Sequence, residues 1–238
     1  MFLPLAAWLP KDDFNSWGWR IPFLFSAALV ITGLWVRLKV SETPEFQANA
    51  ARLLEEEAQL RAYWRDARRR VLGVPAEHQE HLDAPEDTEA LVAARMWRNA
   101  QHHDRPLFLL LGGPLGRGKS FAAAWCIDQL GGRFIASAEM AALKFNEAEV
   151  ESVLRAPCLA LDDFGMEASD AGGWTSAHMF RVLADRYSEK RPTVITTNVW
   201  GPDLEGKFSG ELRRLWDRVL ASGRFVFCGG DSMRKATT

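Results

Sequence analysis

The sequence predicts an α/β fold with a mostly parallel sheet, and three observations lead to this prediction. A short apolar run at 107–112 is followed by a glycine-rich loop and a helical segment. A second run, at 158–162, ends in two aspartates, and a third, at 193–197, is followed by an asparagine. Such runs are typical of buried parallel strands. We expect two further strands at 133–136 and 224–228.

The loop after the first run has the pattern G-x-x-x-x-G-K-S at positions 113–120. Its glycines allow backbone N–H groups to turn toward phosphates, and the helix that begins near Gly118 directs its positive end at them. In this pattern Lys119 pairs with the β- and γ-phosphates, and the Ser120 hydroxyl binds Mg²⁺. The sequence therefore predicts a P-loop NTPase that binds ATP and Mg²⁺. The expected nucleotide-binding residues are Gly113, Pro114, Leu115, Gly116, Arg117, Gly118, Lys119, Ser120 and Phe121.

Polar side chains at the ends of the next strands are expected beside this loop, because strand ends of a parallel sheet meet at one edge. Asp162 suits a carboxylate that holds Mg²⁺. Asp163 is placed to orient or deprotonate the attacking water. Asn198 is either a turn residue, as asparagine often is, or a sensor that touches the γ-phosphate. Beside the other two motifs we favour the sensor role.

The order of these motifs resembles the AAA+ ATPases of the DnaC and IstB group, which are bacterial replicative helicase loaders and transposition helper ATPases. The resembling segments are LFLLLGGPLGRGKSFAAAW, RAPCLALDDFG, DRYSEKRPTVITTN and LRRLWDRVLASGRFVFCGGDSMR, within about 85–235. The resemblance implies an AAA+, RecA-like core over 89–238 and hydrolysis of ATP to ADP and phosphate. It also implies a cytoplasmic role in DNA replication. A replicative helicase or a transposase would be the partner, with single-stranded DNA as a further ligand.

The resemblance also implies roles for several arginines. Arg218 matches an arginine that acts as a finger in a neighbouring subunit, which implies a homo-oligomer in the active form. Arg213 and Arg214 on the same expected helix are its rivals, and a surface salt bridge is the alternative for each. Arg234 matches the family's terminal G-x-D-x-R arginine. Arg117 stands where the family more often has a small residue, and its charge either binds phosphate or points outward.

A P-loop kinase is a lower-ranked alternative, because the asparagine after the third run and the late arginines suit AAA+ proteins better. The three cysteines are Cys126, Cys158 and Cys228, and no two form a C-x-x-C pair. A disulfide framework or a cysteine metal site is therefore not expected. The net charge of −2 does not single out a nucleic-acid-binding protein.

Residues 1–48 differ in composition from the rest of the chain. The run Ile21–Val36 contains no charged residue and is flanked by Trp17 and Trp19. As a helix it would be about 24 Å long, slightly short of the ~30 Å hydrocarbon core of a bilayer. We favour a transmembrane helix, with the following basic residues on the cytoplasmic side. A buried helix of a soluble domain is the alternative.

The segments SWGWRIPF and RLKVSETPEF, on either side of this run, resemble major facilitator transporters of the metabolite:proton symporter type. They match the sixth transmembrane helix and the start of the central cytoplasmic loop of those transporters. One spanning helix cannot form a transport pathway, so transport is not predicted. We interpret the segment as a fusion scar, or an assembly or start-site artefact, which is still compatible with tethering the protein to the inner membrane. A transporter remnant fused to an ATPase is the alternative.

Residues 49–88 are expected to form a helix and a linker. Apolar residues recur at helical spacing, namely Leu53, Leu60, Trp64, Ala67 and Val71. The same stretch holds a basic cluster of Arg61, Arg65, Arg68, Arg69 and Arg70, which we interpret as a solvated helix face rather than a contact with nucleic acid or a partner. Residues 73–88 are polar and contain prolines, as a linker does. Thr88 is expected to cap a helix that runs to about residue 102.

Overall fold

The computed structural model describes residues 10–39, 44–100, 104–142, 146–165, 174–199, 204, 206, 210–230 and 232. The chain divides into two compact units, Met1–Arg61 and Ala62–Thr238, and each is described by itself. Of the expected site residues, Arg234 lies outside the described part of the chain.

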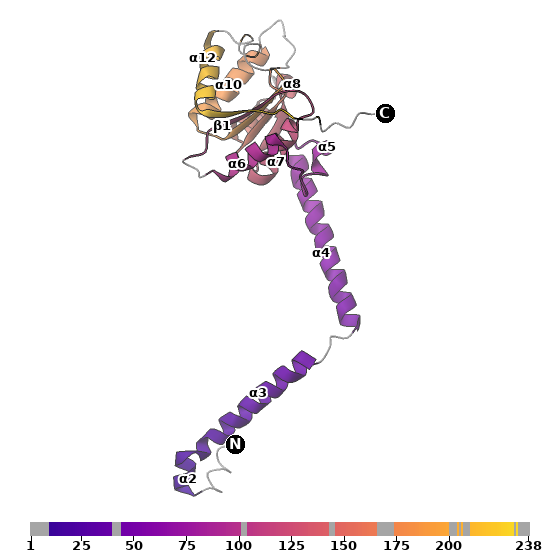
Figure 1. The fold of residues 1–238 in the computed structure, drawn as a ribbon, viewed down its shortest axis with the longest axis vertical. Helices are drawn as coiled ribbons and strands as arrows, with labels where there is room; N and C mark the ends of the chain where they lie inside the picture. The colour runs from indigo at the N-terminus through magenta and orange to yellow at the C-terminus, as the bar shows by residue number, and fades with distance from the viewer. Residues whose placement is uncertain are drawn as a thin grey trace. The chain divides into compact units, whose positions relative to one another are not determined.

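The second unit contains a five-stranded sheet in the order β2-β3-β4-β1-β5, with all neighbouring strands parallel. Figure 1 shows this sheet between helices. This confirms the predicted fold class, and the strand ends differ from those predicted by at most one residue. The strands are β1 (Phe108–Gly112), β2 (Arg133–Ala136), β3 (Leu159–Asp162), β4 (Thr193–Thr197) and β5 (Gly223–Phe227).

Helices cover both faces of this sheet. One hydrophobic core lies under α6 and α7 and includes Leu109 and Leu111 of β1. The core on the opposite face includes Phe108 and Leu110 of the same strand. Successive strand side chains point to opposite faces, so a strand covered on both sides is apolar throughout. The helices are α6 (Glu89–Asn99) and α7 (Lys119–Leu130) on the first face, and α8 (Ser137–Ala142), α9 (Glu147–Arg155), α10 (Trp174–Ser188) and α12 (Gly210–Ala221) on the second.

The helix expected after Thr88 is α6. The Thr88 side chain accepts a hydrogen bond from the N–H of Leu91, as an N-cap does, so this prediction is confirmed. The helix ends at Asn99, earlier than predicted, because the next residue, Ala100, has an extended backbone.

The interpretation of residues 73–88 as a linker is wrong. Val74 and Leu82 are each only 4% exposed and belong to the core under α6 and α7. Between them lies the short helix α5 (Ala76–Gln79). We call residues 73–86 the strap. Two apolar anchors are enough to hold a mostly polar segment against the fold, which composition alone does not reveal.

The solvated-face interpretation of the basic cluster is wrong for Arg69, which is 2% exposed. The other four arginines of the cluster are exposed, as expected. Arg69 lies near the end of α4 (Pro44–Val71), and its Nε donates to Asp128 Oδ1 of α7 at 2.9 Å. Its Nη2 donates to Asp83 Oδ1 of the strap at 2.7 Å, and its Nη1 to the carbonyl of Gln79 at 3.1 Å. Burial works against the charge, but these carboxylates raise the pKa of Arg69 above its usual value.

The first unit contains α2 (Lys11–Ser16), the 3₁₀ helix η1 (Gly18–Arg20), α3 (Ile21–Lys39) and most of α4. Large apolar side chains of α3 are exposed, among them Leu24 at 68% and Val30 at 71%. Of the described chain, the stretch Gly18–Arg37 is long and apolar enough to cross a membrane, by length and composition. The apolar face of α4 is exposed too, with Leu53 at 61% and Leu60 at 58%.

Candidate nucleotide-binding site

The glycine-rich loop between β1 and α7 has the conformation that its sequence predicts. Gly113, Gly116 and Gly118 have φ angles of 135°, 76° and 73°. Such angles are accessible mainly to glycine. A Cβ atom on Gly113 would also lie 2.5 Å from the carbonyl oxygen of Cys228, where no side chain fits. The strand, loop and helix thus direct backbone N–H groups and the amino end of α7 into one cavity.

Lys119 is the first residue of α7, and it is only 5% exposed. Its Nζ donates to the carbonyl of Gly113 at 2.9 Å and to that of Pro114 at 2.6 Å. Burial lowers the pKa of Lys119, while Asp162 and Asp163 act in the opposite direction. The ammonium group therefore lies inside the loop, where it can exchange carbonyl oxygens for phosphate oxygens.

Asp162, at the end of β3, lies next to the P-loop serine. Thr196 Oγ1 of the neighbouring strand donates to Asp162 Oδ1 at 2.5 Å, and the Ser120 hydroxyl is also hydrogen-bonded to this carboxyl group. Burial raises the pKa of Asp162, and the two hydroxyl hydrogen bonds oppose that rise. A hydroxyl and a carboxylate oxygen side by side are the kind of ligands that Mg²⁺ prefers, so the two residues fit this ion.

Asp163 adopts an uncommon backbone conformation, with φ of 54°. Its N–H donates to Thr196 Oγ1 at 3.0 Å, and Asn198 Nδ2 donates to its Oδ1 at 2.8 Å. Strained conformations of residues other than glycine cluster at functional sites. The ends of β3 and β4 therefore bring the predicted carboxylate and amide into direct contact.

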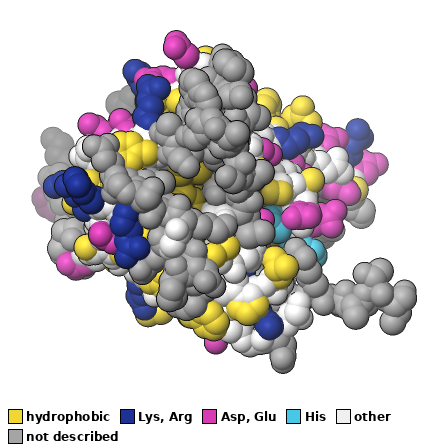
Figure 2. Space-filling model, turned by 90° about the horizontal axis from the view of Figure 1, so that it is seen from above, with side chains coloured by type: hydrophobic (Ala, Val, Ile, Leu, Met, Phe, Trp, Pro, Cys, Tyr) yellow, Lys and Arg dark blue, Asp and Glu magenta, His cyan; other side chains and the backbone are white. Residues whose placement is uncertain are grey.

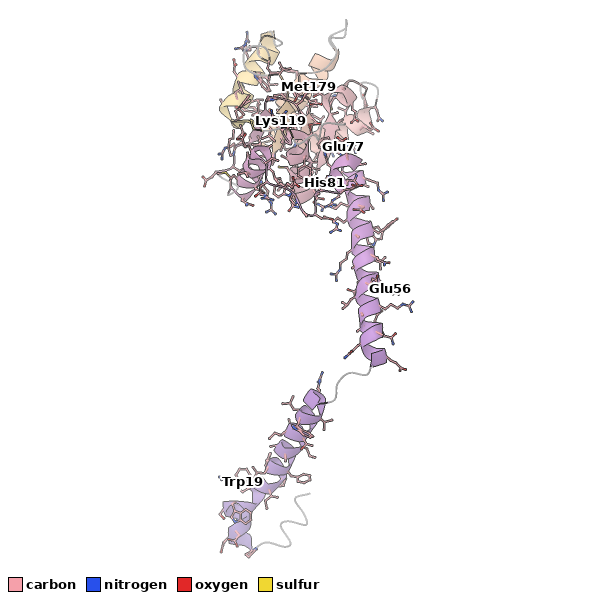
Figure 3. The ribbon with its side chains drawn as sticks, turned by 45° about the vertical axis from the view of Figure 1, so that its right-hand side comes forward. Trp19, Glu56, Glu77, His81, Lys119 and Met179 are labelled. Carbon is pink, nitrogen blue, oxygen red and sulfur yellow. The ribbon has the colours of Figure 1, made fainter. Side chains whose placement is uncertain are left out.

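Of the residues described so far, Lys119, Ser120, Asp163 and Asn198 line one cavity of about 580 Å³. Figure 3 labels Lys119 and, on the strap, Glu77 and His81, which line this cavity. The strap residues were not predicted to contribute. A polar segment ahead of a P-loop gives no sequence signal for such a role. The lining residues are Leu115, Gly116, Arg117, Gly118, Lys119, Ser120, Phe121, Asp163 and Asn198, together with Glu77, His78, His81, Ala84 and Glu86 of the strap.

Two side chains of the cavity stand out. Arg117 is half-buried, and its Nε and Nη1 atoms are buried without a hydrogen-bond partner in the described structure. Buried donors without acceptors are costly, and an anion in the cavity would satisfy them. The imidazole of His78 packs edge-on against the Phe121 ring, with centroids 5.9 Å apart. Burial lowers the pKa of His78, which favours the neutral ring. Figure 2 shows the described histidines beside acidic side chains.

The structure does not bring Arg218 to this cavity. It is exposed on α12 and, with Arg214, lines a separate groove of about 240 Å³ beside Tyr187 of α10. The third candidate on this helix, Arg213, pairs with Asp217 at 3.4 Å. An arginine finger that acts on a neighbouring subunit is expected to lie away from the cavity of its own subunit. The position of Arg218 therefore does not test its predicted role, which stays a prediction.

The sheet order, the P-loop and the strand-end carboxylates together give this chain the fold of a P-loop NTPase of the AAA+ type. Among solved structures, the fold is similar to that of the DnaC helicase loader, with a TM-score of 0.50 and 21% identity over 65% of this chain and 100% of that chain. It is also similar to a protein assigned as a primosome component of Streptococcus pyogenes serotype M3, with a TM-score of 0.51 and 22% identity over 68% of this chain and 93% of that chain. No family model matches the chain.

The amino-terminal segment is similar to transporters. It is 57% identical over 44 residues to the inner membrane metabolite transport protein YhjE of Escherichia coli strain K12, which is 18% of this chain and 10% of that protein. It is 58% identical over 36 residues to the shikimate transporter of the same organism, or 15% of this chain and 8% of that protein. The match confirms the resemblance found in the sequence. The chain spans only about a tenth of the length of these relatives.

Proposed function

We propose that this protein binds ATP with Mg²⁺ and hydrolyses it to ADP and phosphate. The observation that carries the proposal is the convergence of the P-loop and the Asp163–Asn198 pair on one cavity. The unpaired guanidinium atoms of Arg117 in the same cavity support an anionic ligand, and they favour phosphate binding over an outward orientation for this residue.

In the proposed reaction, Lys119 leaves the loop carbonyls and pairs with the β- and γ-phosphates. Ser120 and Asp162 would hold the metal ion, which when bound would neutralise charge on the phosphates. Asp163 accepts a proton from the water that attacks the γ-phosphate in line. Asn198 keeps that carboxylate oriented and contacts the γ-phosphate, so its contacts change once phosphate leaves.

The test is phosphate release by the purified full chain and two variants. We expect Lys119→Ala and Asp163→Asn to remain folded and to lose at least about 99% of the activity, since each removes a group that acts on the γ-phosphate. Glu147→Gln, which changes an exposed carboxylate on α9, is the control and should retain wild-type activity. Full turnover in both site variants would overturn the proposal.

We further propose that the ATPase acts as a helicase loader in the cytoplasm, with a replicative helicase as partner. The likeness of its fold to the DnaC loader supports this role. A transposition helper with a transposase as partner is the alternative, and single-stranded DNA is a proposed ligand in either case. Purification of the full chain from its host with whatever it binds distinguishes the two roles. A transposase without a helicase would reject the first.

The proposed active form is a homo-oligomer in which Arg218 acts on the neighbouring subunit. The exposed position of Arg218, outside its own cavity, supports such a role. The test mixes two inactive variants, Arg218→Ala and Lys119→Ala. An interface between them joins an intact P-loop to an intact finger, so we expect activity in the mixture. Continued inactivity of the mixture, or full activity of Arg218→Ala alone, would contradict the proposal, and activity lost only in Arg214→Ala would move the role to that residue.

We also propose that residues 21–36 tether the chain to a membrane. The exposed apolar side chains of α3 support this. The full chain should sediment with lipid vesicles. Val30→Asp should weaken that association, because a carboxylate at the centre of a membrane helix costs about 3 kcal/mol. Leu60→Asp on α4 is the matched control. A full chain that stays in solution beside vesicles would reject the tether.

A further inference from the structure

Helix α4 carries an apolar stripe to which the proposed function gives no role. The stripe consists of Leu53, Leu60, Trp64, Ala67 and Val71. We propose that this stripe pairs with the same stripe on a second copy of the chain, and that the two α4 helices run antiparallel. The inference goes beyond the proposed function and does not rest on it, because no nucleotide takes part. The contact also differs from the one proposed for Arg218.

The first observation is the position of the stripe on α4. An α-helix turns by about 100° per residue, so Leu60, nine residues before Arg69, lies on the opposite side of the helix from Arg69. The other stripe residues lie within about 40° of Leu60 by the same count. Arg69 is buried against α7, and the Asp66 carboxylate lies 3.8 Å from its Nη1. On the opposite side Trp64 is 68% and Val71 74% exposed, so the elements that bury Arg69 leave these side chains uncovered.

The second observation is the spacing within the stripe. Leu53, Leu60 and Ala67 follow one another at intervals of seven residues, and so do Trp64 and Val71. Together the two rows alternate steps of four and three residues from Leu60 onward. This is the repeat with which two α-helices pack knobs into holes. Single exposed apolar residues are ordinary on a protein surface, whereas a row with this period is typical of a seam between helices. The stripe therefore fits a second helix.

The third observation is the distribution of charge along α4, which selects the occupant. Exposed acidic residues gather in the middle of the helix and exposed basic residues near its end, namely Glu55, Glu56 and Glu57, then Arg65, Arg68 and Arg70. Within the described part of the chain, Arg68 and Arg70 form no ion pair. An antiparallel copy places the acidic part of each helix beside the basic part of the other, whereas a parallel copy places like charges side by side. A second copy in the antiparallel orientation therefore complements the charges of α4.

The stripe also sets the register of the pair. Trp64 packs against Leu60 of the second copy, and Val71 packs against Leu53 of the second copy. Both layers then share one two-fold axis, so each contact occurs twice. The register uses the four large apolar side chains of the stripe in both copies, and it leaves the side of α4 that carries Arg69 free to contact its own unit.

Two charged residues distinguish the orientations. In the antiparallel register Glu56 lies at the edge of the seam, opposite Arg70 of the second copy. Figure 3 labels Glu56 on α4, where it is exposed and pairs with Arg52 at 3.0 Å. Glu57 lies seven residues before Trp64 and so occupies a position in the seam. In a parallel pair Glu57 would face its own copy there, and this repulsion disfavours the parallel orientation.

The experiment is crosslinking of the full chain by a short bismaleimide, which joins two cysteines that lie close together. The native cysteines are buried, so exposed engineered cysteines should react first. Glu56→Cys and Arg70→Cys are prepared separately and mixed in a mild detergent that keeps the apolar helix α3 dispersed. We expect the mixture to give at least about tenfold more crosslinked dimer than either variant alone, because only antiparallel helices bring position 56 close to position 70.

Glu55→Cys mixed with Arg70→Cys is the matched control. Glu55 is the neighbouring exposed carboxylate, but it lies about 100° further from the stripe, so the yield should stay at the level of the single variants. Leu60→Asp, added to both cysteine variants, should lower the yield at least about tenfold, because it places a carboxylate against Trp64 in the seam. Leu54→Asp changes an equally exposed leucine outside the stripe and should leave the yield unchanged.

The other results would overturn the inference. Equal yields from Glu56→Cys alone and from the mixture would show a parallel pair. A mixture that yields no more dimer than the Glu55→Cys control would show that α4 does not pair with its copy. A Leu60→Asp chain that still crosslinks but no longer sediments with vesicles would assign the stripe to the membrane. ATP is absent from every sample, so a failure of the proposed hydrolysis leaves these results unchanged.

Discussion

Arginines are buried in two regions of the second unit, and they are held in different ways. Arg69, beside the nucleotide cavity, is bonded to the carboxylates of Asp128 and Asp83. Arg186, on α10, is 0% exposed, and its hydrogen bonds in the described structure go to Thr193 Oγ1 and to main-chain carbonyls. Burial lowers the pKa of Arg186 to about 10, whereas that of Arg69 is raised.

The difference shows two uses of the same side chain. The carbonyls that Arg186 binds belong to Val153, Leu154, Ala156 and Pro192. They lie at the end of α9 and just before β4, so Arg186 joins two backbone segments, and no side-chain substitution removes a main-chain carbonyl. Arg69 is held by charges, and a charge can be removed by mutation. The first arrangement joins backbone segments of the core, whereas the second joins the strap to α7.

Arg186→Met should have the largest effect. It leaves the carbonyls of Val153 and Ala156 and the Thr193 hydroxyl without this donor, whereas the carbonyls of Leu154 and Pro192 keep Arg191 Nη1 and the Leu159 N–H. Each buried unsatisfied group costs about 1–3 kcal/mol. We expect the free energy of unfolding in urea to fall by at least about 4 kcal/mol. Arg186→Lys should restore little, since an ammonium group has three donors and a different shape. A loss below about 2 kcal/mol would show that the carbonyls find other partners.

Arg69→Met should cost about 3–5 kcal/mol, because it leaves the Asp128 carboxylate buried without a counter-charge. Here a second substitution can compensate. We expect Arg69→Met/Asp128→Leu to return to within about 1 kcal/mol of the wild-type free energy of unfolding. The same measurement on both variants tests the comparison directly. If the double variant is no more stable than the single one, Arg69 is held by its carbonyl contact and resembles Arg186.

Asp83→Asn should have the smallest effect on stability, about 0.5–1 kcal/mol. Its side chain is 46% exposed, so water screens its pair with Arg69. Arg65, 3.1 Å from the other carboxylate oxygen, loses a partner as well. The chemical denaturation that measures this change also gives the stability of Asp66→Asn, which we expect within about 0.5 kcal/mol of wild type. A larger loss of stability in Asp66→Asn would show that Asp66 of α4, rather than Asp83 of the strap, contributes most to holding Arg69.

The sequence allowed prediction of the strands, the P-loop and the strand-end side chains, because each depends on a local pattern. A run such as Phe108–Gly112 is apolar because both faces of the sheet are covered. The glycines after it are needed because the loop has positive φ angles at those positions. The strap was missed because its position depends on contacts far apart in sequence, above all the 59-residue separation between Arg69 and Asp128. Arg186 lies within the segment DRYSEKRPTVITTN, but nothing in that pattern indicated that its side chain is buried.

Two apolar runs also show that a local sequence pattern does not determine long-range contacts. Leu109 and Leu111 of β1 are fully buried by helices of the same unit, whereas Leu24 and Val30 of α3 are exposed. Hydropathy alone does not state what covers an apolar run. Likewise, a role for Arg218 depends on a second subunit, which no pattern within one chain describes. The charge of Arg117 could be interpreted only once its unpaired atoms were located in the cavity.

The central position of β4 has a consequence for how this chain can vary. The strand is buried throughout, yet three of its five residues are threonines. The hydroxyl of Thr196 binds Asp162 and the N–H of Asp163, and that of Thr197 binds the carbonyl of Phe164. Valine at these positions has a similar shape and would keep the strand packed, but it could not hold the aspartates in place. The threonine hydroxyl groups of β4 thus hold the site residues in position. A more hydrophobic β4 would give a more stable sheet, but the aspartates of the site would be less precisely placed.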